Sequence, residues 1–154
     1  MIGRETVMRN YINKIKMKYD YIIIDCMPSL GMITVNALSC ADSVLIPVQA
    51  SYLPVKGLQE LIKTIGKVKR QINPDLEIEG ILVTMVDNRT NYAKEIIAMV
   101  NEAYGQNVTV FDTVIPRSVK QEEAPVSGKT IYSYAGDNKV AKAYQSVVEI
   151  INKK

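Results

Sequence analysis

The chain has 154 residues, of which 47% are hydrophobic and 23% are charged, and its net charge is +3. This composition predicts one globular domain and excludes a strongly basic chain, so any nucleic-acid binding needs a local cationic patch. The absence of histidine excludes Ser-His-Asp and Cys-His catalysis and the usual zinc sites. No apolar run approaches the roughly 20 residues of a membrane span. We therefore expect a cytoplasmic protein without membrane contact.

The spacing of apolar residues predicts helices that alternate with short strands. The helices are expected at residues 4–18, 32–41, 54–72, 91–104 and 140–152, and the strands at 19–25, 43–48, 78–86 and 109–115. This alternation predicts an α/β fold with a mostly parallel sheet flanked by helices, and we expect residues 1–154 to form a single domain. In such sheets ligands bind beyond the carboxyl ends of the strands, so the site is expected there.

The stretch "EEAPVSGKT" ends like a phosphate-binding loop. That loop requires a glycine five positions before the glycine of Gly-Lys-Ser/Thr, and it lies between a strand and a helix. Counting back from Gly128 reaches Glu123, and "TIYSYAGDN" after the lysine is not expected to begin a helix. We therefore interpret Gly128 and Lys129 as part of a turn, and no other glycine in the chain completes the motif.

The strand "YIIID" ends in Asp25. In nucleotide hydrolases an apolar strand that ends in aspartate is the Walker B strand, whose carboxylate helps to hold Mg²⁺ beside the phosphates. Many buried strands also end in aspartate because it caps a helix or begins a turn. These residues alone leave both interpretations open. The two thiols, Cys26 and Cys40, lie in apolar contexts and are expected to be buried and free.

A basic stripe is expected along the helix at 54–72. Its members lie at spacings of seven, four and three residues, and they are Lys56, Lys63, Lys67 and Arg70. One interpretation is the solvated face of an amphipathic helix. The other is a row of phosphate contacts, which gives salt-sensitive DNA binding without sequence preference.

The stretch "YDYIIIDCMPSLGMITVNALSCADSVLIPVQASYLPVKGLQEL" resembles the ParA/Soj family of partition ATPases, which are deviant Walker-type P-loop ATPases. The segments "NPDLEIEGILVTMVDNRTN", "TVIPRSVKQEEAPVSGKTI" and "AKAYQSVVEII" follow in the family's order, so the resemblance covers essentially the whole chain. It implies a P-loop-NTPase-like fold, ATP and Mg²⁺ as cofactors, and ATP-dependent dimerisation. It also implies DNA binding without sequence preference and stimulation by a ParB-like partner. Such a protein would act on the nucleoid in plasmid or chromosome partitioning.

The resemblance also implies roles for individual residues. Asp25 corresponds to the Walker B acid and is expected to support Mg²⁺ directly or through water. A switch-like loop that senses the γ-phosphate follows it and comprises Pro28, Ser29, Leu30 and Gly31, although Met27 replaces the first of the family's two prolines. Pro116 and Arg117 correspond to the segment beside the base and ribose, with an ordinary turn as the alternative for Pro116. Lys120 corresponds to a position on the DNA-binding surface, with a solvated lysine as the alternative.

The family's domain begins with a strand and a "KGGVGKT"-like loop that this sequence does not contain. The resemblance therefore implies an incomplete domain whose front strand and P-loop are missing. We expect negligible ATP hydrolysis by this chain alone, and a homo-oligomer built on uncovered sheet edges. A second hypothesis is a non-catalytic interaction module that binds full-length ParA or a ParB-like protein. A third is a relative of the MinD cell-division ATPases, disfavoured because the end "AYQSVVEIINKK" is typical of a packed helix, not a membrane-binding one.

Overall fold

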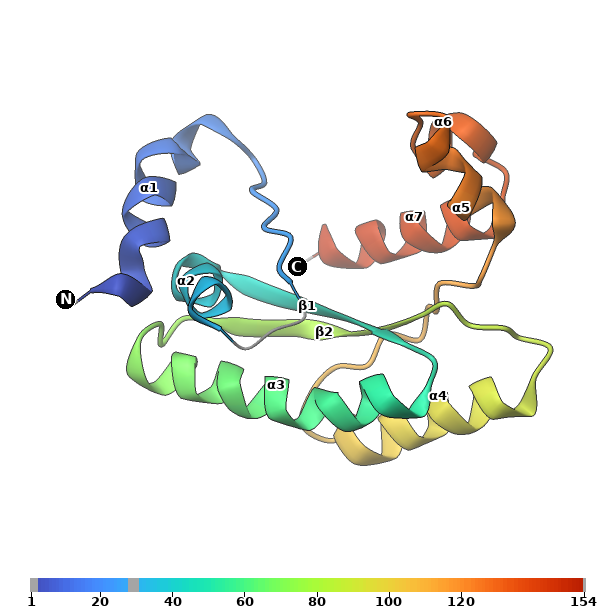
Figure 1. Ribbon diagram of the computed structural model, residues 1–154, viewed down its shortest axis with the longest axis horizontal. Coiled ribbons are helices and arrows are strands. Elements are labelled where there is room, and N and C mark those ends of the chain that lie inside the picture. Colours follow the sequence, from blue (N-terminus) through green and yellow to red (C-terminus); the bar gives the residue numbers. More distant parts are fainter. Residues whose placement is uncertain (1–2, 28–30, 154) are drawn as a thin grey trace. The chain divides into compact units, whose positions relative to one another are not determined.

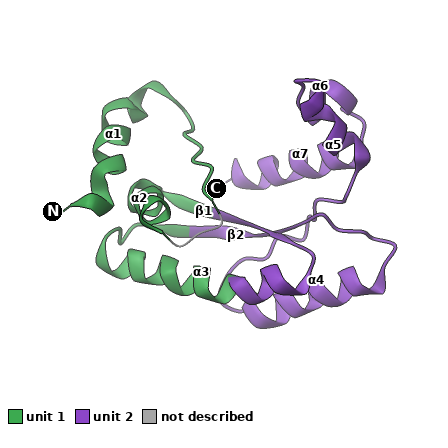
Figure 2. Ribbon diagram, in the orientation of Figure 1, with its two compact units in different colours: residues 1–44, 58–77 green, residues 45–57, 78–154 purple. Residues whose placement is uncertain are grey.

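The computed structural model describes residues 3–27 and 31–153 (Figure 1). These residues fold into two compact units, one of residues 1–44 and 58–77 and the other of residues 45–57 and 78–154 (Figure 2). The helices are α1 (Val7–Ile15), α2 (Met32–Cys40), α3 (Tyr52–Gln71), α4 (Asn91–Tyr104), α5 (Val119–Val126), α6 (Ile131–Ala135) and α7 (Lys139–Ile151). Short 3-10 turns, η1 (Arg4–Thr6) and η2 (Lys16–Lys18), flank α1, and the strands are β1 (Ser43–Gln49) and β2 (Glu77–Thr84).

The sheet is parallel, as the sequence predicted. The Glu77 amide donates to the Asp42 carbonyl over 3.0 Å, and the Ala50 amide donates to the Thr84 carbonyl over 3.0 Å, so both strands run in the same direction. Along β1 the buried side chains are those of Ile46 and Val48, whereas Pro47 between them is exposed. Because proline cannot donate to a ladder, it suits β1, which lies at the edge of the sheet that the described residues form. The prediction of an α/β fold with a helix-flanked parallel sheet is confirmed.

The predicted strand at 109–115 forms only isolated pairings. Val110 bridges Ile81 and Pro116 bridges Val86, both in parallel, on the edge of β2 that does not pair with β1. The Phe111 amide donates to the Ile81 carbonyl, and the Ile115 amide donates to the Val83 carbonyl. Three residues lie between Phe111 and Ile115, but only one lies between their partners in β2. The prediction of a continuous strand was therefore wrong, because the extra residues interrupt the ladder.

The prediction of a strand at 19–25 is also wrong, because the described residues 19–27 form no strand. The chain leaves η2 with an extended Tyr19 (φ −137°, ψ 142°) and then runs as an irregular segment. Its isoleucines were expected in a buried strand, yet Ile23 is 90% exposed. A strand exists only through hydrogen bonds to a neighbour, and sequence periodicity does not reveal whether that neighbour is present.

The core of the second unit lies between β2, the segment 109–116 and the last helix. Its buried cluster comprises Leu82, Phe111, Ile115, Ile131, Val140, Ala141 and Val147. The last three residues share one face of α7, which confirms the helix predicted at 140–152. Gly80 permits this packing because a Cβ there would lie 2.5 Å from the Phe111 ring. The cluster thus joins a C-terminal helix to the sheet edge that carries Pro116.

Two helices near the C-terminus were not predicted. α5 contains Pro125 in its last turn, and α6 begins after Thr130, whose hydroxyl accepts a 3.2 Å hydrogen bond from the Ser133 amide. The expectation that no helix begins after the Gly-Lys turn was wrong, because this N-cap satisfies an otherwise unpaired donor. Gly128 (φ +62°) turns the chain between these two helices. The element directly before this turn is the helix α5 and not a strand, so the turn is not a phosphate-binding loop. None of the described helices combines the length and apolar character that a membrane span requires.

Candidate functional site

Two loops of the second unit meet at the carboxyl ends of neighbouring parallel segments. The first follows β2 and contains Asp87 and Arg89, and the second contains Pro116 and Arg117. The Arg117 amide donates to the Val86 carbonyl over 3.0 Å, and Val86 and Pro116 form a parallel bridge. This edge is where α/β sheets bind ligands. Pro116 and Arg117 therefore lie at this edge of the sheet, and their role beside the base and ribose stays a prediction.

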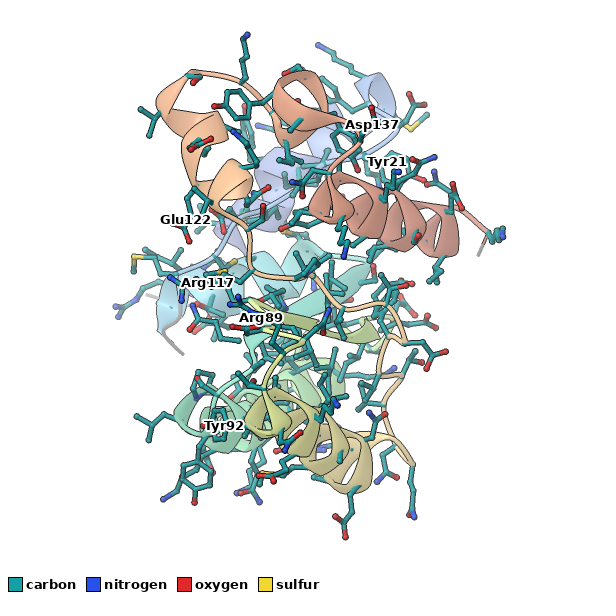
Figure 3. The ribbon with its side chains drawn as sticks, turned by 90° about the vertical axis from the view of Figure 1, so that its right-hand side faces the viewer. Tyr21, Arg89, Tyr92, Arg117, Glu122 and Asp137 are labelled. Atoms are coloured by element: carbon teal, nitrogen blue, oxygen red, sulfur yellow. The ribbon has the colours of Figure 1, made fainter. Side chains whose placement is uncertain are left out.

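A charged turn that the sequence reasoning missed lies in the first of these loops. The Arg89 guanidinium donates to both Asp87 carboxylate oxygens, at 2.9 Å from Nε and 2.8 Å from Nη2, and the Arg89 amide donates to Oδ1 over 3.1 Å. These hydrogen bonds from Arg89 lower the pKa of Asp87 to about 2, and the charge of Arg117 contributes in the same direction. Figure 3 shows Arg89 and Arg117 in this region. The signal in the sequence was the polar run "DNRT" directly after a predicted strand.

The Asp87–Arg89 pairing leads to a prediction about pH. Because the folded pKa of Asp87 lies below its ordinary value of 3.8, the pairing is intact above that value and is lost as the pH falls toward about 2. An NMR titration of the Asp87 carboxyl carbon is expected to give a midpoint near 2, and Arg89→Gln is expected to move it toward 3.8. Lys94→Gln, on exposed α4 surface, serves as the control and leaves the midpoint unchanged. An ordinary midpoint in the unmodified chain would contradict the pairing.

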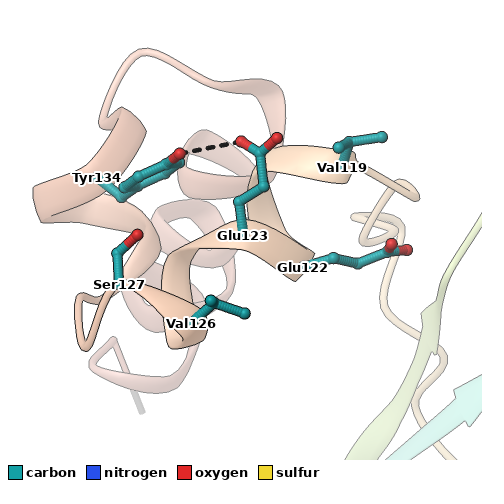
Figure 4. Close-up of a pocket in the computed structure, with 6 residues that line it drawn as sticks. All are labelled: Val119, Glu122, Glu123, Val126, Ser127 and Tyr134. Atoms are coloured by element: carbon teal, nitrogen blue, oxygen red, sulfur yellow. Dashed lines mark hydrogen bonds between the residues drawn. The ribbon is translucent and has the colours of Figure 1, made fainter.

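Lys120 lies in a small cluster on α5 and α6, close to Arg117 in sequence. Its ammonium contacts Glu123 Oε2 at 3.0 Å and lies 5.6 Å from the centre of the Tyr134 ring, whose hydroxyl donates to the same oxygen over 3.0 Å. Figure 4 shows the shallow pocket beside this cluster, which is lined by Val119, Glu122, Glu123, Val126, Ser127 and Tyr134. Arg117 contacts Glu122 at 3.6 Å. The cationic charge at both positions is therefore partly balanced by neighbouring carboxylates.

Asp25 lies in the first unit, where its side chain is exposed at the end of the irregular segment. Gly31, the last residue of the predicted switch-like loop, is the extended N-cap of α2 (φ −79°, ψ −179°). The other three predicted loop residues, Pro28, Ser29 and Leu30, lie outside the described residues. The roles of Asp25 and this loop stay predictions.

The predicted Mg²⁺ site depends on the carboxylates that the described residues provide. Within residues 3–27 and 31–153, no three acidic, cysteine or histidine side chains gather as a metal-binding group. A single exposed carboxylate such as Asp25 still fits Mg²⁺, because this ion keeps several waters and takes one or two carboxylates together with phosphate oxygens. The expectation of two buried thiols was wrong for Cys26, which is exposed, whereas Cys40 is half-buried. Cys26 follows Asp25 on the segment 19–27, which pairs with neither of the described strands.

The cationic residues predicted on α3 are exposed. The side chains of Lys67 and Arg70 are exposed to solvent. Lys63 Nζ lies 2.8 Å from Glu60 Oε1, in an exposed ion pair one helical turn apart. Such exposed pairs contribute about 0–1 kcal/mol and rearrange readily. The stripe is thus available to an anionic ligand, and the structure is equally consistent with a solvated helix face.

Comparison with known proteins defines the class first. A family model described as an AAA domain matches residues 1–78. The structure is similar to a cobyrinic acid a,c-diamide synthase from Mycobacterium smegmatis with a bound ATP analogue and magnesium, with a TM-score of 0.77 and 31% identity over 95% of this chain and 52% of that one. The fold is thus that of a P-loop ATPase of the ParA/MinD type, present in part.

The curated relatives narrow the class to a family. The chain is 45% identical to the sporulation initiation inhibitor protein Soj of Bacillus subtilis over 93% of its own length and 56% of Soj. It is 44% identical to the chromosome partitioning protein ParA of Myxococcus xanthus over 92% of its length and 50% of that protein. The chain belongs to the ParA/Soj family of P-loop ATPases. It spans about half the length of the curated relatives that it matches.

Proposed function

We propose that residues 1–154 are one partial domain of a ParA-type partition ATPase that works in the segregation of chromosomes or plasmids. The observation that carries the proposal is the pairing of the Pro116–Arg117 loop with the loop after β2, at the sheet edge where this fold binds ligands. The likeness to the chromosome partitioning protein ParA of Myxococcus xanthus supports it, and so does the likeness to the sporulation initiation inhibitor protein Soj of the same family. The proposed ligands are ATP and Mg²⁺.

The proposed roles of individual residues follow from the resemblance to the family. Pro116 and Arg117 contact the base and ribose, and the Asp87–Arg89 pair holds the neighbouring loop in place. Asp25 supports Mg²⁺ through water, and residues 28–31 respond to the γ-phosphate. Mg²⁺, when bound, supplies positive charge against the phosphate oxygens. Phosphoryl transfer depends on positioning and charge stabilisation, and these residues include no loop that cradles a triphosphate, so the chain alone is proposed to be hydrolytically inactive.

The proposed partners are those of a partition system. They are non-specific DNA, a ParB-like protein that stimulates hydrolysis, and a second copy in an ATP-dependent dimer, all acting at the nucleoid in the cytoplasm. The DNA proposal is supported by the exposed cations of α3, and Lys120 is proposed as a further contact that must leave Glu123 to reach a phosphate.

A non-catalytic module that binds full-length ParA or a ParB-like protein remains the second candidate, favoured by the absence of a phosphate-binding loop from the sequence. A MinD-like cell-division role ranks third. The likeness to Soj and ParA favours partitioning over both, because it extends over more than nine-tenths of the chain. The module would be favoured by two results together. The chain would co-purify with a full-length relative, and no assembly that contains the chain would bind nucleotide.

The test is the binding of a fluorescent ATP analogue in the presence of Mg²⁺. The purified chain is expected to show neither saturable binding nor turnover. A chimaera in which the front strand and P-loop of Bacillus subtilis Soj precede this chain is expected to bind the analogue, and Asp25→Ala is expected to weaken Mg²⁺-dependent binding at least about tenfold, by roughly 1.4 kcal/mol.

Asp75→Ala, in an exposed turn of the same unit, serves as the matched control and should bind like the parent chimaera. Turnover by the chain alone that Asp25→Ala abolishes would show that the missing loop is dispensable. A correctly folded chimaera that never binds nucleotide would contradict the proposed function.

A further inference from the structure

Three side chains on α5 and α6 make a contact that we call the α5–α6 clamp, and they are Lys120, Glu123 and Tyr134. The Lys120 ammonium lies 3.0 Å from Glu123 Oε2. The Tyr134 hydroxyl donates to the same oxygen over 3.0 Å (Figure 4). Lys120 Nζ also lies 5.6 Å from the centre of the Tyr134 ring, within the range of a cation–π contact. One carboxylate and one aromatic ring thus hold the same cation.

The lysine is the member of the clamp that can move most easily. Across the turn between the two helices, the Lys129 amide donates to the Ala124 carbonyl over 3.0 Å, and Ala124 is buried. Glu123 and Tyr134 are half-buried beside this turn. The Lys120 side chain is 53% exposed, and its ammonium sits on a flexible four-carbon stem. Lys120 can therefore leave the clamp while the carboxylate and the ring stay in place.

The clamp balances the charge of a cation that the proposed function assigns to DNA. The hydrogen bond from Lys120, and after it that from Tyr134, lowers the pKa of Glu123, so this carboxylate is ionised at neutral pH. The same bond raises the pKa of Lys120. A phosphate that approached the clamped ammonium would meet the negative charge of Glu123, at a cost in like-charge repulsion. A DNA contact by Lys120 therefore requires that the ammonium first leave Glu123.

The neighbouring carboxylate on α5 offers a matched comparison. Glu122 Oε1 lies 3.6 Å from Arg117 Nε, a distance longer than that of a hydrogen bond. Glu123, the next residue, hydrogen-bonds to Lys120 instead. The two carboxylates thus carry the same charge at adjacent positions of one helix but pair with different cations. An effect that belongs to the clamp should depend on Glu123, and an effect of charge alone should depend on both.

We propose, on the basis of the proposed function, that the α5–α6 clamp is an autoinhibitory contact that keeps Lys120 from DNA. In the free protein Glu123 and Tyr134 hold the ammonium, and DNA binding exchanges the carboxylate for a phosphate. Because the old contact is lost when the new one forms, the clamp weakens DNA binding. An exposed ion pair and an exposed cation–π contact each shift an equilibrium by up to about fivefold, which sets the size of the effect.

The test is a double-mutant cycle at Lys120 and Glu123, in which the 154-residue chain is titrated with fluorescent duplex DNA at low salt. Glu123→Gln is expected to raise DNA affinity about three- to tenfold, because it frees Lys120. It should also steepen the slope of log K against log salt by about 1, since one more phosphate is contacted. Lys120→Gln is expected to cost at least about threefold more affinity in the Glu123→Gln background than in the parent chain.

Glu122→Gln is the matched control, because it removes the same charge and leaves Lys120 paired with Glu123. It should raise DNA affinity by less than about twofold, and equally with or without Lys120, since only screened long-range repulsion is lost. An NMR titration of the Lys120 side chain without DNA gives an independent readout. Glu123→Gln is expected to lower the pKa of Lys120, and Glu122→Gln is expected to leave it unchanged.

The outcomes separate a failure of the clamp from a failure of the proposed function. Equal gains in affinity from Glu123→Gln and Glu122→Gln would overturn the clamp and leave DNA binding in place. The same follows if Lys120→Gln costs as much in the parent chain as in the Glu123→Gln background, or if the pKa of Lys120 does not respond to Glu123→Gln. If no variant binds DNA at low salt, Glu123→Gln included, the proposed DNA binding is wrong and the clamp has no such role.

Discussion

Replacing Lys63, Lys67 and Arg70 together with glutamine is expected to weaken the binding of duplex DNA about 10- to 100-fold at low salt, and to lower the slope of log K against log salt by about 2 to 3. Each phosphate contact releases about one counterion, so three lost contacts set the size of the change in slope. The three side chains are exposed on α3, within one unit, and the Glu60–Lys63 pair does not prevent Lys63 from turning to a phosphate. The measurement is a fluorescence titration at several salt concentrations.

The matched control removes the same charge elsewhere. Lys94, Lys139 and Lys142 are exposed on α4 and α7, and their glutamine variants should change DNA affinity little. Equal losses in the two triple variants would mean that only net charge matters. Binding that does not respond to salt would reject the phosphate-contacting stripe and leave α3 with an ordinary solvated face.

Arg9→Met is expected to lower the free energy of unfolding by about 3 kcal/mol. The Arg9 guanidinium donates from Nε to the Ser39 carbonyl over 2.7 Å, and Nη2 donates to the same carbonyl and, over 3.0 Å, to the Ile72 carbonyl. These carbonyls lie at the C-terminal ends of α2 and α3, where the helix dipoles favour a cation. Methionine keeps most of the aliphatic stem but leaves the partly buried carbonyls without this donor.

The measurement for Arg9 is urea unfolding followed by circular dichroism. Lys14→Met is the matched control, because Lys14 is exposed on the same helix, and it should change stability by less than about 0.5 kcal/mol. If the two variants unfold at the same urea concentration, Arg9 does not hold α1 to the ends of the other helices. A loss confined to the signal of α1 would indicate local detachment.

Most helices and both assigned strands could be predicted because their signals are local. The apolar stripe of α7 indicates a helix, and the β-branched run of β1 indicates a segment that forms a strand where a neighbour pairs with it. α5 and α6 were not predicted, because Pro125 and Gly128 are residues typical of loops and their local signal argues against a helix. The Thr130 cap and the burial of Ile131 in the α7 cluster outweigh those preferences.

The candidate site was predictable only in part. That Pro116 and Arg117 follow a sheet segment was visible in the sequence, together with the resemblance that assigned them to a nucleotide. The Asp87–Arg89 pair was not predicted, because its relation to Arg117 depends on residues about 30 positions apart meeting at one sheet edge. Polar residues after a strand are common, and only the bridge between Val86 and Pro116 distinguishes this turn from others.

The sequence by itself determined the family, the alternation of helices and strands, and the absence of a phosphate-binding loop, because these depend on residue identity and spacing. Only the tertiary structure decided which apolar segments are covered. The run at 19–25 and the run in β1 look alike in sequence, yet β1 has β2 beside it and Ile46 is buried, whereas Ile23 is exposed. The physical reason is that a strand is stabilised by hydrogen bonds and packing from a neighbouring segment, and these are properties of the pair.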